Sequence, residues 1–217
     1  MKALVVLSGG ADSTTALYWA KKEFDEVEAV FFNYGSRQNK TEIIYARKSC
    51  KKLGVKLNEF KLDFMRDFKS DLLDKRKKIS DEAYNGENIK NIVVPFRNGI
   101  MLSAAAGLAE SNGLDFVVLG NHSGDHEIYP DCRPEFIEAI GNAIKRGTNG
   151  KVRILSPFCD ITKSEIVKKG AELGVDYSLT YSCYCGEKIH CGVCPTCRER
   201  KEAFIQNNIK DETKYKE

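Results

Sequence analysis

Directly after a short apolar run, the chain has a turn rich in glycine and hydroxyl groups, Ser8-Gly9-Gly10-Ala11-Asp12-Ser13-Thr14-Thr15. Residues 3–7 before it are typical of a strand buried on both faces, and the residues after it have a helical pattern. Two adjacent glycines let the backbone close around a ligand, and the amides that open a helix carry partial positive charge. The turn therefore predicts an oxyanion site, for phosphate in particular, with hydroxyl donors from Ser8, Ser13, Thr14 and Thr15.

The same turn has a second interpretation. Asp12 lies in the first helical turn, where a carboxylate can cap the helix or bind a cation, so an ordinary tight turn is the alternative to a binding site. The turn fits neither Gly-x4-Gly-Lys-Ser/Thr nor Gly-x-Gly-x-x-Gly, so it is neither of those phosphate-binding motifs.

A second candidate for phosphate binding follows a capping box. Thr162 precedes a predicted helix, and Glu165 lies at the spacing of reciprocal N-terminal capping. The box places Lys163 in the first turn, near the carboxyl ends of the predicted strands. A lysine there is either solvated or positioned to contact a phosphate.

Five of the eight cysteines lie between Cys183 and Cys197. The spacing Cys191-x2-Cys194-x2-Cys197 directs three thiolates at one point, and the fourth ligand is one of three neighbours, Cys183, Cys185 or His190. In a chain without an export signal, such crowding indicates a metal site rather than disulfides. Four thiolates suit a closed, structural Zn²⁺ site, although the same spacing also occurs in iron–sulfur ligation.

Alternating strand and helix patterns must position these groups. The chain has 217 residues, 42% of them apolar, which predicts one α/β domain built from parallel βαβ units. In such a sheet, ligands bind beyond the carboxyl ends of the strands, which is where the glycine-rich turn lies. The predicted strands are 3–7, 27–34, 55–62, 115–119 and 152–155, and the predicted helices are 12–23, 38–53, 98–111, 133–146 and 163–173, with a short tail helix through Phe204.

Residues 65–91 interrupt this alternation. The stretch is charged and has few apolar anchors, which predicts a surface helix and a long loop. It is either a solvated excursion or a lid over the site, because long loops in compact domains are often functional.

Charge and hydropathy narrow the class of protein. With 34 basic and 31 acidic residues the net charge is only +3, which by itself does not indicate a nucleic-acid-binding protein. No apolar stretch approaches the ~18 residues of a membrane span, and no export signal is recognisable, so we expect a cytoplasmic protein without a membrane partner.

The glycine-rich turn resembles the PP-loop of the ATP pyrophosphatase superfamily, whose members adenylate a substrate oxygen. Seven stretches are similar, in order, to the QueC family of 7-cyano-7-deazaguanine (preQ0) synthases: VLSGGADSTT, FNYGSRQ, VPFRNGIMLSAAAGLAE, YPDCRPEFIEAI, SPFCDITKSEIVKKGAELGV, TYSCY and CGVCPTCRERKEAF. The resemblance implies a five-stranded parallel sheet of the adenine nucleotide α-hydrolase-like (HUP/PP-loop) type over residues 1–178. It also implies a small zinc-binding segment over residues 179–217, packed on that domain.

The resemblance further implies an ATP-dependent ligase that converts 7-carboxy-7-deazaguanine and ammonia to the nitrile through adenylated carboxylate and amide intermediates. A carboxylate is a poor electrophile, so such an enzyme must hold ATP, with Mg²⁺, in line with the acid and neutralise charge. The implied catalytic residues are Lys163, Arg97 and Asp12, and the implied ATP-binding residues are Ser8, Gly9, Gly10, Asp12, Ser13, Thr14, Tyr34, Gly35 and Arg37. The implied deazaguanine site is Tyr129, Asp131, Arg133 and His122, with zinc on Cys183, Cys191, Cys194 and Cys197.

Departures from the family pattern keep alternatives open. The stretch NHSGDHEI, residues 121–128, replaces the usual Asp-Tyr-Ser-Gly segment, so another carboxylate substrate is conceivable. A PP-loop enzyme that thiolates or adenylates a tRNA base is the main alternative, and a non-catalytic nucleotide-binding module is a third. A separate RNA-binding domain does not fit in the chain, so nucleic acid is not expected as a direct substrate. The resemblance alone implies a homodimer.

Overall fold

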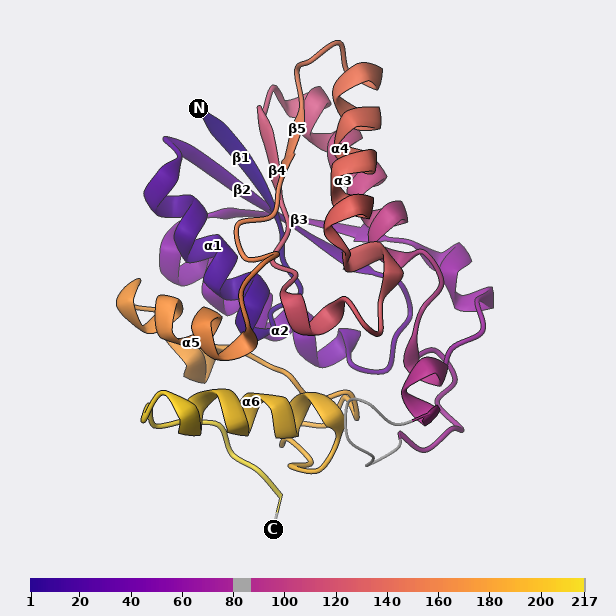
Figure 1. Ribbon diagram of the computed structural model, residues 1–217, viewed down its shortest axis with the longest axis vertical. Coiled ribbons are helices and arrows are strands. Elements are labelled where there is room, and N and C mark those ends of the chain that lie inside the picture. The colour runs from indigo at the N-terminus through magenta and orange to yellow at the C-terminus, as the bar shows by residue number, and fades with distance from the viewer. Residues whose placement is uncertain (80–86, 217) are drawn as a thin grey trace.

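A parallel sheet of five strands forms the centre of the protein, in the order β3-β2-β1-β4-β5 (Figure 1). The structure is a computed structural model that describes residues 1–79 and 87–216, with the backbone alone for 87–89. Every pair of neighbouring strands is parallel, with Val5 opposite Ala29 on one side of β1 and opposite Val118 on the other. The strands are β1 Lys2–Val6, β2 Glu26–Asn33, β3 Lys56–Lys61, β4 Phe116–Val118 and β5 Arg153–Leu155.

Helices cover both faces of this sheet because residues in β1 alternate between two apolar clusters. Ala3 and Val5 pack with residues of α1 and α2, whereas Leu4 packs with residues of α3 and α4. Figure 1 shows the two helix pairs on opposite sides of the sheet. The helices are α1 Ala11–Glu23, α2 Asn39–Leu53, α3 Arg97–Asn112, α4 Pro134–Gly147, α5 Lys163–Glu172 and α6 Pro195–Gln206.

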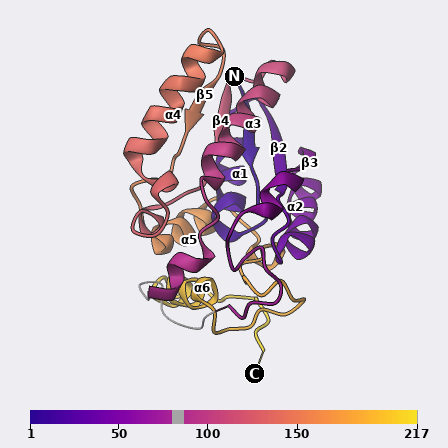
Figure 2. The same ribbon diagram turned by 90° about the vertical axis from the view of Figure 1, so that its right-hand side faces the viewer.

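The strand order opens a crevice beside the end of β1. The chain leaves β1 toward β2 on one side, while β4 lies on the other, so the connections diverge at the carboxyl ends of β1 and β4. Helices α5 and α6 pack on each other through Val167, Ala203 and Phe204, and both lie beyond these strand ends (Figure 2). The tail therefore closes one side of the crevice.

Outside the excursion over residues 65–91, the predicted strands and helices all occur, with ends that move by a few residues. One stretch, Lys90–Asn112, is long and apolar enough to cross a membrane by length and composition. The α3 part of it buries Leu102, Ala105 and Ala109 against the sheet, as a core helix does.

The charged excursion is anchored more firmly than its sequence suggests. Met65, Leu72 and Ile79 are buried in the same cluster as Leu4, so the prediction of few apolar anchors was wrong for this part. The predicted surface helix is limited, in the residues described, to the 3-10 segments Asp63–Asp67 and Glu87–Ile92, and residues 80–86 lie outside the described chain.

Burial of Leu72 gives a test of whether this excursion is packed or behaves as a loose lid. Leu72→Ala is expected to lower the free energy of unfolding by roughly 2–5 kcal/mol, because it leaves a cavity in a filled core. Urea denaturation followed through the single tryptophan, Trp19, measures this. The exposed Lys69→Ala serves as the control, and an equally small loss in both variants would mean that the excursion is solvated.

Candidate functional site

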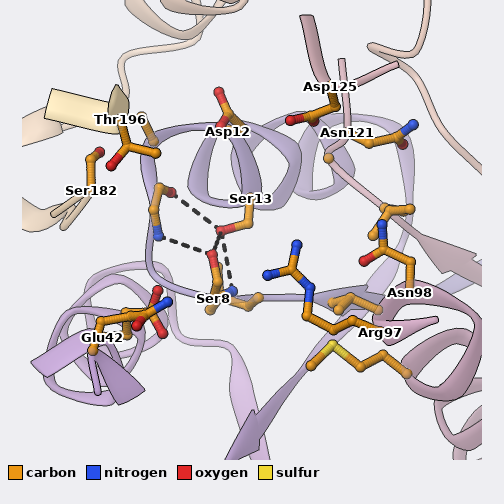
Figure 3. Close-up of a pocket in the computed structure, with 18 of the residues that line it drawn as sticks. Ser8, Asp12, Ser13, Glu42, Arg97, Asn98, Asn121, Asp125, Ser182 and Thr196 are labelled. Carbon is orange, nitrogen blue, oxygen red and sulfur yellow. Dashed lines mark hydrogen bonds between the residues drawn. The ribbon is translucent and has the colours of Figure 1, made fainter. Parts of the chain in front are cut away.

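A cavity of about 200 Å³ lies at the carboxyl ends of β1 and β4 (Figure 3). Its floor is the glycine-rich turn, and its walls come from the first turns of α2 and α3, the loop after β4, the start of α5 and the segment around the cysteines. Segments from almost the whole length of the chain therefore meet here, as the predicted crevice requires.

The glycine-rich turn has the geometry of an anion site. Ser13 Oγ accepts from the Ser8 amide at 3.2 Å and lies 2.9 Å from Ser8 Oγ, so both hydroxyls are held at the cavity floor. Gly9 has φ +86°, and a Cβ there would lie 2.6 Å from the carbonyl oxygen of Glu42. A side chain at this position would push the turn away from α2, so only glycine permits the close approach.

A buried group of charges borders the turn. Asp12 is ion-paired with Lys163, whose ammonium lies 3.8 Å from Glu199, and Glu199 lies 3.7 Å from the His122 ring. Burial alone would raise the pKa of Asp12, but the Lys163 ammonium holds it below its ordinary value. Burial acts to lower the pKa of Lys163, and the carboxylates of Asp12 and Glu199 keep it raised. Lys163 is therefore a fixed cation beside the anion site.

Unpaired oxygens remain in this group of charges. In the described chain, Asp12 Oδ1 and Thr14 Oγ1 are buried without a hydrogen-bond partner. Buried polar atoms usually have a hydrogen-bond partner, so these two atoms indicate that a ligand, an ion or water completes the site. A carboxylate oxygen in this position suits Mg²⁺, which binds through one or two carboxylates together with phosphate oxygens.

Arg97 forms the opposite wall. Its guanidinium lies between two aromatic rings, 6.0 Å from the centre of Tyr34 and 5.7 Å from that of Tyr129. No carboxylate of the described residues lies within 4.0 Å of it, and its nearest hydrogen bond is a long one, 3.5 Å to Tyr34 Oη. A guanidinium with spare donors in a cavity is suited to bind a carboxylate or phosphate from a ligand.

Three acidic residues of the cavity, Glu42, Asp125 and Glu199, were not predicted as site residues from the sequence. Glu42, on α2, is held by Asn39 Nδ2 at 3.1 Å, and burial raises its pKa to about 7. Glu199, on α6, has a raised pKa because of burial, which outweighs the opposing effect of Lys163. Nothing in the local sequence distinguishes Glu42 or Glu199 from a surface glutamate, since only tertiary packing turns them inward.

Apart from the cysteines, the predicted site residues divide into three groups. Nine line the cavity: Ser8, Gly10, Asp12, Ser13, Tyr34, Arg97, His122, Tyr129 and Lys163. Gly9 and Thr14 shape the turn from behind. Four others face elsewhere in the structure, and they are Gly35, Arg37, Asp131 and Arg133.

Each of these four residues contacts another part of the protein chain. Gly35 packs against the Arg66 side chain, and Arg37 Nη2 donates to the carbonyls of Asp71 and Lys77 at 2.9 and 2.7 Å, so these residues anchor the excursion and do not line the cavity. Asp131 accepts from the Asn98 amide at 2.7 Å at the start of α3, and Arg133 Nε donates to the His126 carbonyl at 2.8 Å.

The four predicted metal-binding cysteines come together. The sulfurs of Cys183, Cys191, Cys194 and Cys197 all lie within 4.8 Å of one another, and a tetrahedral zinc thiolate site has sulfurs about 3.8 Å apart. His190 is engaged otherwise, because its Nε2 accepts from the Ser182 amide at 2.9 Å. Among the residues described, this set fits a closed four-thiolate metal site.

The fold and the cavity define a PP-loop α/β protein, in agreement with the predicted fold class. The U34-tRNA thiolase NcsA from Methanococcus maripaludis, a solved structure, matches with a TM-score of 0.54 at 18% identity, over 96% of this chain and 66% of that one. A 4-thiouridine synthetase, solved with RNA and bound ATP, matches with a TM-score of 0.53 at 19% identity, over 94% of this chain and 50% of that one. At such identities the likeness concerns the fold alone.

The family is shown by closer relatives. The family model described as "Queuosine biosynthesis protein QueC" matches residues 2–208, and the chain belongs to this family. A protein named 7-cyano-7-deazaguanine synthase from Porphyromonas gingivalis is 49% identical over 98% of this chain and 96% of its own length. A protein of the same name from Desulfotalea psychrophila is 47% identical over 98% of both chains.

The pKa of Glu42 leads to a prediction about stability. A carboxyl whose folded pKa is raised to about 7 stabilises the fold fully below its ordinary pKa of 4.5, and this contribution is lost as the pH rises through 7. Between pH 4.5 and 8, the free energy of unfolding of the ligand-free protein is expected to fall by about 2 kcal/mol more than that of Glu42→Gln. This figure allows for contact of the carboxyl group with water in the cavity. Urea denaturation at several pH values measures this, and a difference independent of pH would contradict it.

The ligand set can be tested by exchanging neighbouring cysteines. The unchanged protein is expected to bind roughly one metal ion per chain. Cys183→Ser is expected to bind much less, because a closed site needs all four thiolates. Cys185→Ser, its matched control two residues away, is expected to retain the metal. Metal analysis of the purified proteins by mass spectrometry distinguishes them, and the reverse pattern would exchange the ligand assignment.

Proposed function

We propose that this protein converts 7-carboxy-7-deazaguanine and ammonia to 7-cyano-7-deazaguanine (preQ0) with ATP. The observation that carries the proposal is the Arg97 guanidinium, which has no carboxylate within 4.0 Å among the described residues and lies in the same cavity as the hydroxyl-lined turn. A carboxylate site beside a phosphate site is what adenylation of an acid requires. The names of relatives up to 49% identical support the choice of substrate.

In the first half of the reaction, a carboxylate oxygen attacks the α-phosphorus of ATP, and pyrophosphate leaves. Ser8, Ser13 and the amides at the start of α1 hold the phosphates, and Lys163 stabilises the charge that develops on the leaving pyrophosphate. Mg²⁺, held by Asp12, would neutralise charge on the phosphates. Ammonia then displaces AMP from the acyl adenylate, and loss of a proton leaves the amide.

In the second half, the amide oxygen attacks the α-phosphorus of a second ATP, pyrophosphate leaves, and loss of one N–H proton gives an adenylated imidate. Loss of AMP and of the remaining nitrogen proton then gives the nitrile, so each turnover to the nitrile consumes two ATP. His122 lines the cavity and lies beside Glu199, which makes it the candidate acceptor for the protons released. His126, the other histidine of this loop, lies 3.6 Å from Cys159 Sγ and is not among the cavity residues.

For recognition of the base, we propose a different carboxylate from the one predicted. Asp131 is bound to the start of α3, whereas Glu42 faces the cavity and, within the described chain, accepts a hydrogen bond only from Asn39. A carboxylate there can accept from the N1–H and the exocyclic amine of the deazaguanine, while Tyr129 offers a ring face for stacking.

The tRNA-thiolation alternative is less well supported. Cys132 lines the cavity, but burial raises the pKa of its thiol and outweighs the lowering effect of Asn98, which donates to the sulfur at 3.0 Å. A thiol kept neutral in this way is a poor nucleophile. We further propose zinc as the metal ion and a cytoplasmic homodimer as the working form, on family membership alone.

The reaction itself is the first test. Protein, ATP, Mg²⁺, ammonium and 7-carboxy-7-deazaguanine are incubated, and the nitrile is sought by mass spectrometry together with AMP and pyrophosphate. Two AMP per nitrile are expected. Consumption of ATP with tRNA, but not with the acid, would favour the thiolation alternative.

Arg97→Gln tests the proposed carboxylate site. Loss of this guanidinium is expected to lower kcat/KM for the acid by roughly 10²- to 10³-fold, because a charge-assisted, bidentate contact is lost in the adenylation step. ATP binding should change much less. Arg47→Gln, an exposed arginine paired with Glu59, is the control and should retain full activity. Equal loss of acid and ATP binding would place Arg97 on the nucleotide instead.

A further inference from the structure

Residues next to the metal-binding cysteines also line the cavity. Ser182 and Tyr184 flank Cys183, and Thr196 and Glu199 lie within two residues of Cys197; all four line the cavity. In Figure 3, Ser182 and Thr196 lie together on the same side of the phosphate turn. The cysteine segment is therefore one wall of the site as well as a clasp for the tail.

The same segment holds the phosphate turn directly. The amide of Tyr181 donates to the carbonyl of Gly9 at 2.8 Å, and the Tyr181 carbonyl lies 3.5 Å from where a Cβ of Gly10 would stand. These contacts come from the residue two positions before Cys183. A displacement of the loop around Cys183 would therefore also displace the backbone of the glycine-rich turn.

On the substrate side, the wall meets the proposed acid-binding residues. Tyr184 Oη lies 3.1 Å from Tyr129 Oη, and the Tyr129 ring lies beside the Arg97 guanidinium. Glu199 contacts the Lys163 ammonium from α6. Tyr184 therefore connects Cys183, the preceding residue, with Tyr129 and Arg97, the residues proposed to hold the acid.

We propose that the metal-bound segment is a wall of the substrate site, with Tyr184 as its positioning residue, so that the metal and the acid strengthen each other's binding. The inference rests on the proposed function. If the two sites share this wall, the coupling must be reciprocal: the acid tightens metal binding by the factor by which the metal tightens binding of the acid.

Competition with a chromogenic chelator measures the zinc dissociation constant of the holoprotein with and without saturating 7-carboxy-7-deazaguanine. We expect the acid to tighten zinc binding about tenfold, within the usual range of coupling between sites. The acid is first shown to bind the holoprotein by calorimetry. Failure at that step would refute the proposed function, whereas binding of the acid with unchanged zinc affinity would refute only the coupling.

Variants separate a shared wall from simple loss of folding. Tyr184→Ala should retain one zinc per chain and unchanged zinc affinity without the acid, while the coupling falls to less than about twofold. Each variant is measured with the acid at ten times its own dissociation constant. Ile189→Ala, an exposed residue of the same segment, is the matched control and should keep the full coupling.

Trp19 reports whether the main domain stays folded when the metal is removed. It packs against Phe24 and Phe158, in the cluster on the α1 face of the sheet, so its emission follows that core. Native emission after zinc removal, together with weakened acid binding, would support the coupling. Tyr184→Ala with coupling equal to that of the control would overturn the assignment of Tyr184.

Discussion

Close packing around Gly9 is the constraint on which the rest of the site depends. The backbone of α2 stands where any side chain at this position would lie, and the Tyr181 amide binds the Gly9 carbonyl from the other side. The turn is thereby fixed between two segments distant in sequence. The hydroxyls of Ser8 and Ser13 and the amides that open α1 border the cavity, an arrangement that suits an anion.

Charge in a confined space is the second organising principle. Lys163 and Arg97 are cations at the cavity wall, and Asp12, Glu42 and Glu199 are acids there. Only Lys163 has a close carboxylate partner within the described chain; Arg97 has none. Charges removed from water without partners are costly, so the cavity is arranged for ligands that supply the missing ones. The nucleotide phosphate and the substrate carboxylate of the proposed reaction would supply them.

The loop after β4 holds its own shape through hydrogen bonds between its side chains and its backbone. His122 Nδ1 accepts from the Gly124 amide, and the Asp125 carboxylate accepts from the His122 amide, so the loop caps its own short 3-10 turn. This fixed turn presents His122 to the cavity beside Glu199. His122 and Asp125 thus form a wall of the cavity that is held by hydrogen bonds within the loop.

Much of this architecture can be predicted from local sequence. Apolar runs and helical spacing give all five strands and six helices, because buried strands and amphipathic helices have distinct periods. The residue types of the turn Ser8–Thr15 and the capping box at Thr162 can be recognised from neighbouring residues alone, and the cysteine spacing indicates a metal site. Tertiary structure decided what local pattern leaves open. The sulfur of Cys183 lies with those of Cys191, Cys194 and Cys197, whereas Cys185 and His190 are not part of that group. Packing turns Glu42 and Glu199 toward the cavity. Arg37 and Asp131 form hydrogen bonds to backbone groups. The direction in which a polar side chain points depends on segments far away in the chain, and sequence spacing carries no information about them.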